Sequence, residues 1–325
     1  MDFSFSSGVK LLASDHYLIE TENLTKKFGE FTAVEDLNLK IKEEEIFGFL
    51  GPNGAGKTTS IRMMVGLLSP TSGKVNFGDM GDSLPEEKVG VCPQDLVLWD
   101  ELTSYENLRF MGNMYGVPKR KLNKRVERVL KDLGLTDKRD NLASELSGGM
   151  QRRLNLGMSI IHHPEIVVLD EPSAGLDPQS RYSVWEYIKG LIEEKTRCII
   201  LTTHLMEEAD RVSDRVGIID NGDLKVVDTP EKLKKNVGEG DSIKIELEDK
   251  RKNSAAVETL ESLDKVIRTS EASNRVVVRA LDAVGNTNLF KEALTEAGMS
   301  VIDISISQTN TLEDVFIHLT GRGLE

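Results

Sequence analysis

The segment "GFLGPNGAGKTTSIRMM", Gly48 to Met64, crowds small and rigid residues between two apolar stretches. The run "EIFGFL" (Glu45–Leu50) leads into it and is typical of a buried strand. Beyond the glycines, apolar side chains recur at helical spacing, at Ile61, Met64, Val65 and Leu68. This order predicts a strand, a tight loop and a helix in succession.

The loop matches the pattern G-x-x-x-x-G-K-[ST], through Gly51, Gly56, Lys57 and Thr58. Glycines let several backbone N–H groups point at one anion, because no Cβ atoms block its approach. The helix that follows directs the positive end of its dipole at the same point. A chance glycine turn is the alternative. We favour a nucleoside triphosphate site, because the whole pattern occurs in the setting it requires.

Each polar residue of the loop then has an expected role. Lys57 would reach the β- and γ-phosphates, the Thr58 hydroxyl would bind Mg²⁺, and Thr59 would contact the α-phosphate. The remaining members of the expected phosphate cradle are Asn53, Gly54, Ala55 and Gly56.

A second motif, "EIVVLDEPSAGLD" (Glu165–Asp177), supplies the carboxylates that such a site needs. Its four apolar residues, Ile166 to Leu169, predict a central strand of a parallel sheet, and ligands bind at the carboxyl ends of such strands. We expect Asp170 to hold Mg²⁺ and Glu171 to orient and deprotonate the attacking water. The alternative for Glu171 is that it caps the next helix.

Composition narrows the class of protein. The 325 residues, 39% hydrophobic and 29% charged, suit a soluble protein with one large and one small domain. The net charge of −13 disfavours nucleic acid as a partner.

Cys92 and Cys198 are expected to be buried, reduced thiols. No apolar run is long enough to cross a bilayer, and residues 1–16 read as an extension and not as a signal peptide, so we expect a cytoplasmic chain.

Two further segments carry a family resemblance: "LSGGMQRRLNLGMSII" (Leu146–Ile161) and "IILTTHLMEEADRV" (Ile199–Val212). Together with the first two motifs they resemble an ATP-binding-cassette (ABC) ATPase, over about residues 17–230. The resemblance implies ATP and Mg²⁺ as cofactors. It also implies an α/β fold: a P-loop NTPase core with a mixed sheet, an antiparallel β region and a helical subdomain.

The resemblance assigns Ser147, Gly148 and Gly149 to the family's signature loop. This loop is a second anion cradle, yet the chain has only one phosphate-binding loop. In the family a head-to-tail dimer resolves this, because Ser147 and Gly149 of one copy contact the γ-phosphate held by the other. A purely structural Ser-Gly-Gly turn is the alternative.

Other matched residues have roles that only the resemblance implies. Gln94 corresponds to the glutamine that senses Mg²⁺ and the attacking water, and His204 to the switch histidine at the γ-phosphate. Asp177 ends the D-loop, and Phe28 corresponds to the aromatic that stacks on adenine. A structural His204 and a core Phe28 remain open alternatives.

Met150 stands where the family usually has glutamine, and Phe28 where it usually has tyrosine. Neither departure removes an atom that meets phosphate.

The segment after Gln94 matches the family's helical subdomain, at about residues 95–160. One predicted helical face comprises Leu122, Val126, Val129, Leu130 and Leu133. In the family the edge of this subdomain receives a short helix from a membrane subunit. The residues expected to line or border that groove are Trp99, Leu102, Tyr105, Leu108 and Phe110. Packing within the subdomain's own core is the alternative for each of them.

Beyond residue 230 the composition changes, and residues 231–325 are expected to form an accessory domain. Strand, helix, two strands, helix and strand follow in order, which predicts a small α+β, ferredoxin-like fold. The last helix, in "TLEDVFIHLTGRG", resembles the ending of ATPases that serve daunorubicin-resistance-type exporters.

These features favour an ATPase that drives export through separate integral-membrane subunits, on the cytoplasmic face of the membrane. A soluble ABC ATPase of the translation or DNA-repair type is the alternative, but such proteins usually carry two cassettes, long coiled coils or basic surfaces. A sensor that binds nucleotide without turnover is opposed by the presence of Glu171, His204 and Gln94.

Overall fold

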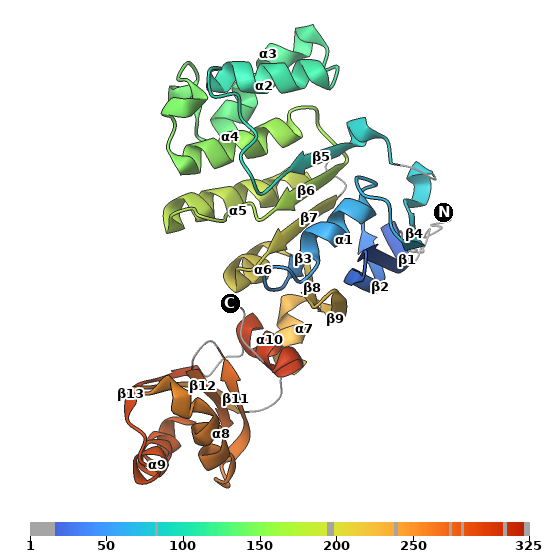
Figure 1. The fold of residues 1–325 in the computed structure, drawn as a ribbon. Helices are drawn as coiled ribbons and strands as arrows, with labels where there is room; N and C mark the ends of the chain where they lie inside the picture. Colours follow the sequence, from blue (N-terminus) through green and yellow to red (C-terminus); the bar gives the residue numbers. More distant parts are fainter. Residues whose placement is uncertain are drawn as a thin grey trace, which may run out of the picture.

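The computed structural model describes residues 17–81, 84–193, 198–236, 240–272, 275–280, 283–307 and 311–321. Three sheets organise this part of the chain, and helices pack around them (Figure 1). The expected N-terminal extension, residues 1–16, lies outside the described residues. No helix of the described part is both long enough and apolar enough to span a membrane.

The central sheet has six strands in the order β5-β6-β7-β3-β8-β9. Its strands are β3 (Glu45–Leu50), β5 (Val89–Cys92), β6 (Ile166–Asp170), β7 (Cys198–Thr203), β8 (Arg215–Asp220) and β9 (Asp223–Asp228). All neighbours are parallel except β8 and β9, so the sheet is mixed, as expected. Every residue of β3, β6 and β7 is buried, which explains why apolar residues dominate these strands.

Helices cover both faces of this sheet. Leu169 and Leu201 belong to a core shared with α5 (Pro178–Glu193), whereas Val168 and Ile200 belong to one shared with α1 (Lys57–Met64). This alternation follows from the period of two along a strand. Helix α6 (Met206–Val212) follows β7.

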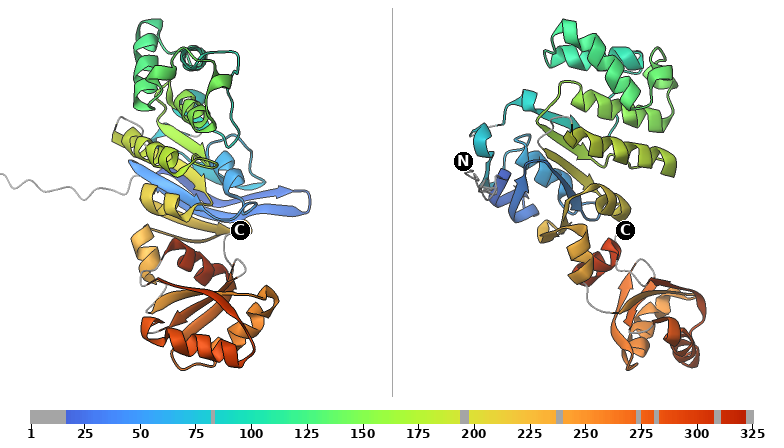
Figure 2. Two further views of the ribbon diagram at one scale, coloured as in Figure 1. Left: turned by 90° about the vertical axis from the view of Figure 1, so that its left-hand side faces the viewer. Right: turned by 180° about the vertical axis from the view of Figure 1, so that it is seen from behind.

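The antiparallel β region is a second, three-stranded sheet in the order β2-β1-β4. Its strands are β1 (Tyr17–Phe28), β2 (Phe31–Lys42) and β4 (Ser72–Asn76). The β1–β2 hairpin extends beyond the body of the molecule (Figure 2), and Phe28 pairs with Phe31 near its turn. Phe28 is 52% exposed, so it is not a core residue.

The helical subdomain consists of α2 (Ser104–Met114), α3 (Lys119–Asp132) and α4 (Gly148–Ile160). A capping box between Thr103 and Glu106 begins α2. The predicted apolar face of α3 is buried against its neighbours. Short 3₁₀ helices connect the elements: η1 (Gly78–Met80), η2 (Glu86–Lys88), η3 (Thr136–Lys138), η4 (Ala143–Glu145) and η5 (Lys250–Lys252).

The C-terminal residues form a four-stranded antiparallel sheet in the order β11-β12-β10-β13. The elements in chain order are β10 (Asp241–Leu247), α8 (Asn253–Glu261), β11 (Val266–Ala272), β12 (Arg275–Ala280), α9 (Ala283–Glu296) and β13 (Val301–Ser307). This βαββαβ order, with the first and third strands at the centre, confirms the ferredoxin-like prediction.

Two more helices lie where the C-terminal sheet meets the rest of the chain, α7 (Pro230–Asn236) and α10 (Leu312–Thr320) (Figure 1). Phe316 of α10 is fully buried in a core that also contains Leu50 of β3 and Leu233 of α7. The last described helix therefore packs against elements of the first 236 residues, and the domain boundary at residue 230 stays a prediction.

Candidate nucleotide-binding site

The glycine-rich loop lies between β3 and α1, as predicted. A Cβ atom on Gly51 would sit 2.2 Å from the backbone oxygen of Ile219, which no side chain tolerates. Gly56, just before α1, has a φ of +100°, and a Cβ there would come within 2.6 Å of the Ala33 oxygen. Both glycines are therefore required by the path of the backbone itself.

Lys57 is buried within the loop. Its Nζ donates to the backbone oxygens of Gly51, at 2.7 Å, and Pro52, at 3.0 Å, and lies 3.8 Å from Oε1 of Glu171. Burial lowers the pKa of Lys57, while the Glu171 and Asp170 carboxylates oppose that shift. The loop thus places a buried cation beside the two acidic residues of the second motif.

Asp170, at the end of β6, links the two motifs directly. The Thr58 hydroxyl donates to both of its carboxylate oxygens, at 3.1 and 3.0 Å, and the Thr202 hydroxyl donates to Oδ1 at 2.5 Å. Hydroxyl and carboxylate oxygens suit Mg²⁺, which also keeps water and phosphate ligands. The described residues contain no cluster of three His, Cys, Asp or Glu side chains that could hold a metal without other ligands. A Mg²⁺ ion here would therefore also need water and phosphate oxygens.

Glu171 is contacted by Gln94 and His204 as well as by Lys57. Gln94 Nε2 donates to its Oε2 at 3.5 Å, and Nδ1 of His204 lies 3.1 Å from its Oε1. Its φ of +49° is rare for a residue other than glycine, and the Thr202 carbonyl and hydroxyl hold its N–H at 3.1 and 3.0 Å. The next helix, α5, begins only at Pro178, so Glu171 caps no helix there.

The glycine-rich loop, Gln94 and Glu171 border a cleft of about 460 Å³, whereas Asp170 and His204 are not among the residues that line it. Its lining comprises Phe28, Phe31, Ala33, the loop from Asn53 to Thr59, Gln94 and Glu171. Phe31, 63% exposed, was not predicted, although its pairing with Phe28 across a short hairpin is a signal that the sequence contains.

The signature loop is not among the residues that line this cleft. Ser147 and Gly148 are exposed, and Ser147 is the N-cap of α4, where its hydroxyl accepts a hydrogen bond from Met150 N at 3.4 Å. Asp177 is also outside the lining. Its carboxylate accepts from Ser180 N at 3.0 Å, and its hydrogen bonds with Ser180 hold its pKa below the usual range.

Arg152 is a residue that the sequence reasoning missed. Its buried guanidinium donates to five backbone oxygens, at distances from 2.6 to 3.1 Å. The acceptors are those of Pro93, Gln94, Asp170, Glu171 and Pro172. One side chain thus joins the segment around Gln94 to the two carboxylate residues. The signal in the sequence is weak: a cation beside an apolar helical stripe.

A buried carboxylate fixes the segment after Glu171 in a similar way. Glu208 Oε1 accepts from the Ser173 hydroxyl at 2.7 Å and from Trp185 Nε1 at 2.9 Å. Burial raises the pKa of Glu208, and these donors oppose the shift. This contact ties the segment after β6 to α6, which follows His204.

A buried strand, a glycine loop leading into a helix, a buried lysine and a paired Asp-Glu at a neighbouring strand end define a P-loop nucleotide-binding protein. The comparisons with known proteins narrow this class. A family profile described as "ABC transporter" matches residues 34–174. The chain belongs to this family, because similar proteins match it over nearly their full length.

One such relative is the linearmycin resistance ATP-binding protein LnrL of Bacillus subtilis, 36% identical, with 94% of this chain and 99% of the relative covered. The daunorubicin resistance ATP-binding protein DrrA2 of Streptomyces coeruleorubidus is 34% identical, with 96% and 97% covered. Among solved structures, cbiO1 of Clostridium perfringens has a TM-score of 0.61 at 26% identity, covering 67% of this chain and 90% of that one. The chain is thus an ABC transporter ATP-binding subunit and an ATPase.

Proposed function

We propose that this chain powers an exporter by closing head-to-tail with a second copy of itself around ATP and Mg²⁺. One observation carries the proposal. The phosphate-binding loop, Gln94 and Glu171 share one cleft, whereas the signature loop lies exposed and outside it. A signature loop that cannot serve its own cleft is expected to serve that of another copy.

Within one copy the roles follow the geometry. Backbone N–H groups from Asn53 to Thr59 would cradle the phosphates, with Lys57 on the β- and γ-phosphates. Thr58, Asp170 and Gln94 would bind Mg²⁺ directly or through water. Phe28 would stack on adenine, and its exposed ring at the lip of the cleft supports that role.

The hydrolytic step would use Glu171 as the general base. Its carboxylate is buried near Lys57 and His204, so it can take a proton from a water positioned by Gln94. His204 would hold the γ-phosphate oxygens. The strained backbone at Glu171 keeps this carboxylate aimed into the cleft.

The partner copy would complete the site with Ser147, Gly148, Gly149 and Asp177. The exposed N-terminus of the thirteen-residue helix α4 suits an anion, because unpaired N–H groups and the helix dipole point at it. ATP would then bridge the two copies, and loss of the γ-phosphate would release them.

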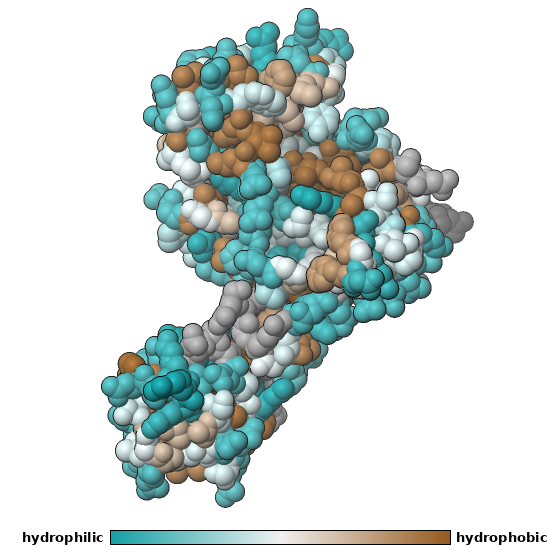
Figure 3. Space-filling model, in the orientation of Figure 1, coloured by the Kyte–Doolittle hydropathy of each residue, from teal (hydrophilic) through white to brown (hydrophobic). Residues whose placement is uncertain are grey.

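Separate integral-membrane subunits would dock beside Gln94. The exposed apolar side chains there are Leu96, Val97, Trp99, Phe110 and Met114. Figure 3 shows apolar surface at the level of the β5–α2 connection, and the Trp99 and Phe110 rings pack edge to face with centroids 4.4 Å apart. Leu108 is fully buried in the subdomain core, so its expected place in the groove is wrong.

The proposed direction of transport, export, is inferred from the names of similar proteins. Several relatives are named for linearmycin or daunorubicin resistance or for export, including a Nod factor export protein of Ralstonia nicotianae that is 40% identical over 211 residues. We extend that direction to this chain and place it at the cytoplasmic face of the membrane.

The test is the variant Glu171→Gln, which keeps the shape of the side chain but cannot accept the proton. It should lose steady-state ATP turnover by about 10²-fold or more and should elute as a dimer with ATP, measured by light scattering. Glu186→Gln, at an exposed position on α5, is the matched control and should behave as wild type.

Adding Ser147→Ala to Glu171→Gln should abolish the dimer while fluorescent ATP still binds the monomer. A Glu171→Gln protein that stays monomeric at saturating ATP would contradict the proposal, as would a double variant that dimerises normally.

A further inference from the structure

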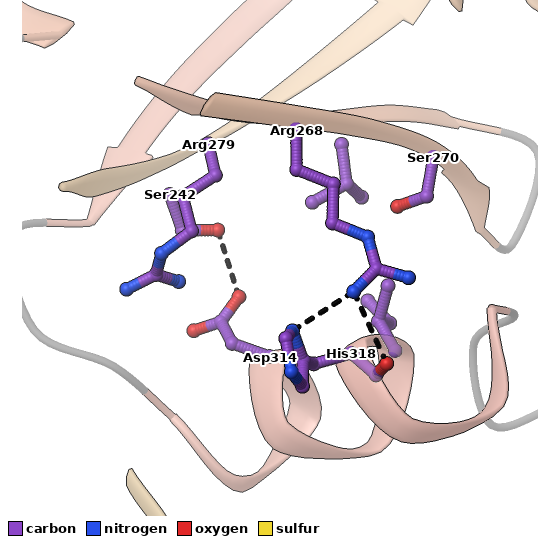
Figure 4. A pocket seen from close by; sticks show the side chains of 8 residues that line it. Ser242, Arg268, Ser270, Arg279, Asp314 and His318 are labelled. Atoms are coloured by element: carbon purple, nitrogen blue, oxygen red, sulfur yellow. Dashed lines mark hydrogen bonds between the residues drawn. The ribbon is translucent and has the colours of Figure 1, made fainter. Parts of the chain in front are cut away.

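A second hollow lies far from the nucleotide cleft, between the C-terminal sheet and α10 (Figure 4). Arg268, Ser270 and Arg279 line it from the sheet, and Asp314 and His318 line it from the helix. Its volume is about 30 Å³, and a water molecule needs roughly 10–15 Å³ by this measure. It therefore has room for a group of about the size of a carboxylate.

The guanidinium of Arg268 is the unusual feature of this hollow. Its Nη1 donates to Nδ1 of His318, at 3.0 Å, and to the backbone oxygen of His318, at 3.3 Å. Both acceptors are neutral, and no carboxylate of the described residues forms an ion pair with Arg268. Two other arginines of the C-terminal residues differ, since Arg275 pairs with Glu246 at 3.0 Å and Arg251 with Asp249 at 2.9 Å.

The acid that lines the hollow, Asp314, is already engaged. Its Oδ1 accepts from the Ser242 hydroxyl at 2.7 Å, and its Oδ2 accepts from the backbone and hydroxyl of Thr311, both at 2.8 Å. His318 is neutral here, because its Nδ1 accepts from Arg268. Burial, Arg268 and Arg279 lower the pKa of His318. Arg268 is thus a cation of the hollow that has no ion pair with a carboxylate of the described residues.

We propose that this hollow binds the carboxylate of a small organic acid, with Arg268 as the principal donor and Ser270 beside it. A guanidinium matches a planar carboxylate in geometry as well as charge. Two further lining residues, Val277 and Ile317, are apolar and would contact only the carbon next to the carboxylate, with the rest of the chain outside the hollow. A phosphate dianion fits less well, because its second charge would meet Asp314.

The position of the hollow gives such binding a structural consequence. One face of α10 lines the hollow, while its Leu312, Val315 and Phe316 pack with Leu50, which directly precedes the phosphate-binding loop. A bound acid would therefore hold the C-terminal sheet to the helix that touches the nucleotide-binding part.

The experiment follows the ring resonances of His318 by NMR in the nucleotide-free full chain, assigned with His318→Gln. Butyrate is the probe, and inorganic phosphate at equal ionic strength is the comparison. Butyrate should give a saturable shift. Arg268→Gln should weaken its binding at least about tenfold, as expected when a charged hydrogen bond is lost.

Arg275→Gln is the matched control, because it removes an arginine on the neighbouring strand that already has an acidic partner. It should bind butyrate within about twofold of wild type. The proposal that this hollow is a binding site would be overturned if the butyrate-induced shift of the His318 resonances never saturated. It would also be overturned if the shift were equal in the Arg268 and Arg275 variants. Tighter binding of phosphate than of butyrate would overturn its assignment to a carboxylate.

Discussion

At the scale of single residues, Arg152 shows how much of the site depends on a group that never meets the nucleotide. Its five acceptors belong to the segments that carry Gln94 on one side and Asp170 and Glu171 on the other. Carbonyls of different segments share one buried cation, so removing that cation leaves several of them without a partner.

We expect Arg152→Met, which keeps much of the apolar stem, to lower the free energy of unfolding by at least about 3 kcal/mol. It should also reduce ATP turnover, because Gln94 and Glu171 lose their common anchor. Urea unfolding and a steady-state ATPase assay measure the two effects.

Arg153→Met is the matched control. Arg153 makes one short hydrogen bond, to the Leu133 oxygen at 2.8 Å, so the loss there should be about 1 kcal/mol. Equal losses in the two variants would show that Arg152 has no special structural role.

The loop residues and Arg152 differ in how far they could be predicted. Lys57, Thr58 and Asp170 belong to local motifs whose chemistry depends on neighbours in the chain, and the structure brings the three together. The role of Arg152 depends on acceptors 18 to 59 positions away. No local pattern encodes such a contact, because it forms only when α4 packs against β5 and β6.

At the scale of elements, the junction between α4 and β5 contains a histidine that is held neutral. The His162 ring stacks on Tyr115, with centroids 3.8 Å apart, and its Nε2 donates to the Val89 oxygen at 3.1 Å. Its Nδ1 is buried and has no hydrogen-bond partner among the described residues. A second proton would have no acceptor, and burial lowers the pKa of His162 to about 4.

This pKa has a defined consequence for stability. The folded value lies below the ordinary value of about 6.5, so the unfolded chain takes up the proton first as the pH falls. The contribution of neutral His162 to the free energy of unfolding is complete above about pH 6.5 and is lost as the pH drops toward 4. His162→Phe retains a ring that can stack on Tyr115 but cannot be protonated. We expect the free energy of unfolding of wild type, relative to that of this variant, to be lower at pH 4.5 than at pH 7.

Urea unfolding at both pH values provides the measurement. Because the other titrating groups are common to both proteins, the difference isolates His162. A difference that does not change with pH would contradict a neutral, buried imidazole.

At the scale of the whole molecule, α10 joins two parts that the sequence presents as separate (Figures 1 and 2). Its apolar side chains share a core with β3, β8 and α7, and its polar side chains face the C-terminal sheet. The stability of the nucleotide-binding part should therefore depend on the far end of the chain.

Phe316→Ala should test this dependence. The side chain is fully buried, so we expect a loss of about 3–5 kcal/mol. Calorimetric unfolding should show a lower Tm for the transition that bound ATP stabilises. Leu319→Ala, at a position 39% exposed on the same helix, should change stability by less than about 0.5 kcal/mol. If the ATP-sensitive transition is unchanged in Phe316→Ala, α10 does not support the nucleotide-binding part.

The sequence by itself determined the phosphate-binding loop, the carboxylate pair, the buried parallel strands and the ferredoxin-like order of elements. These depend on local residue chemistry and on periodicity, which a single chain records directly. Only the tertiary structure decided the five-carbonyl role of Arg152, the burial of Leu108, the packing of α10 and the hollow around Arg268. Each of these depends on which distant surfaces come to face one another, and that follows from packing the whole core rather than from any one segment.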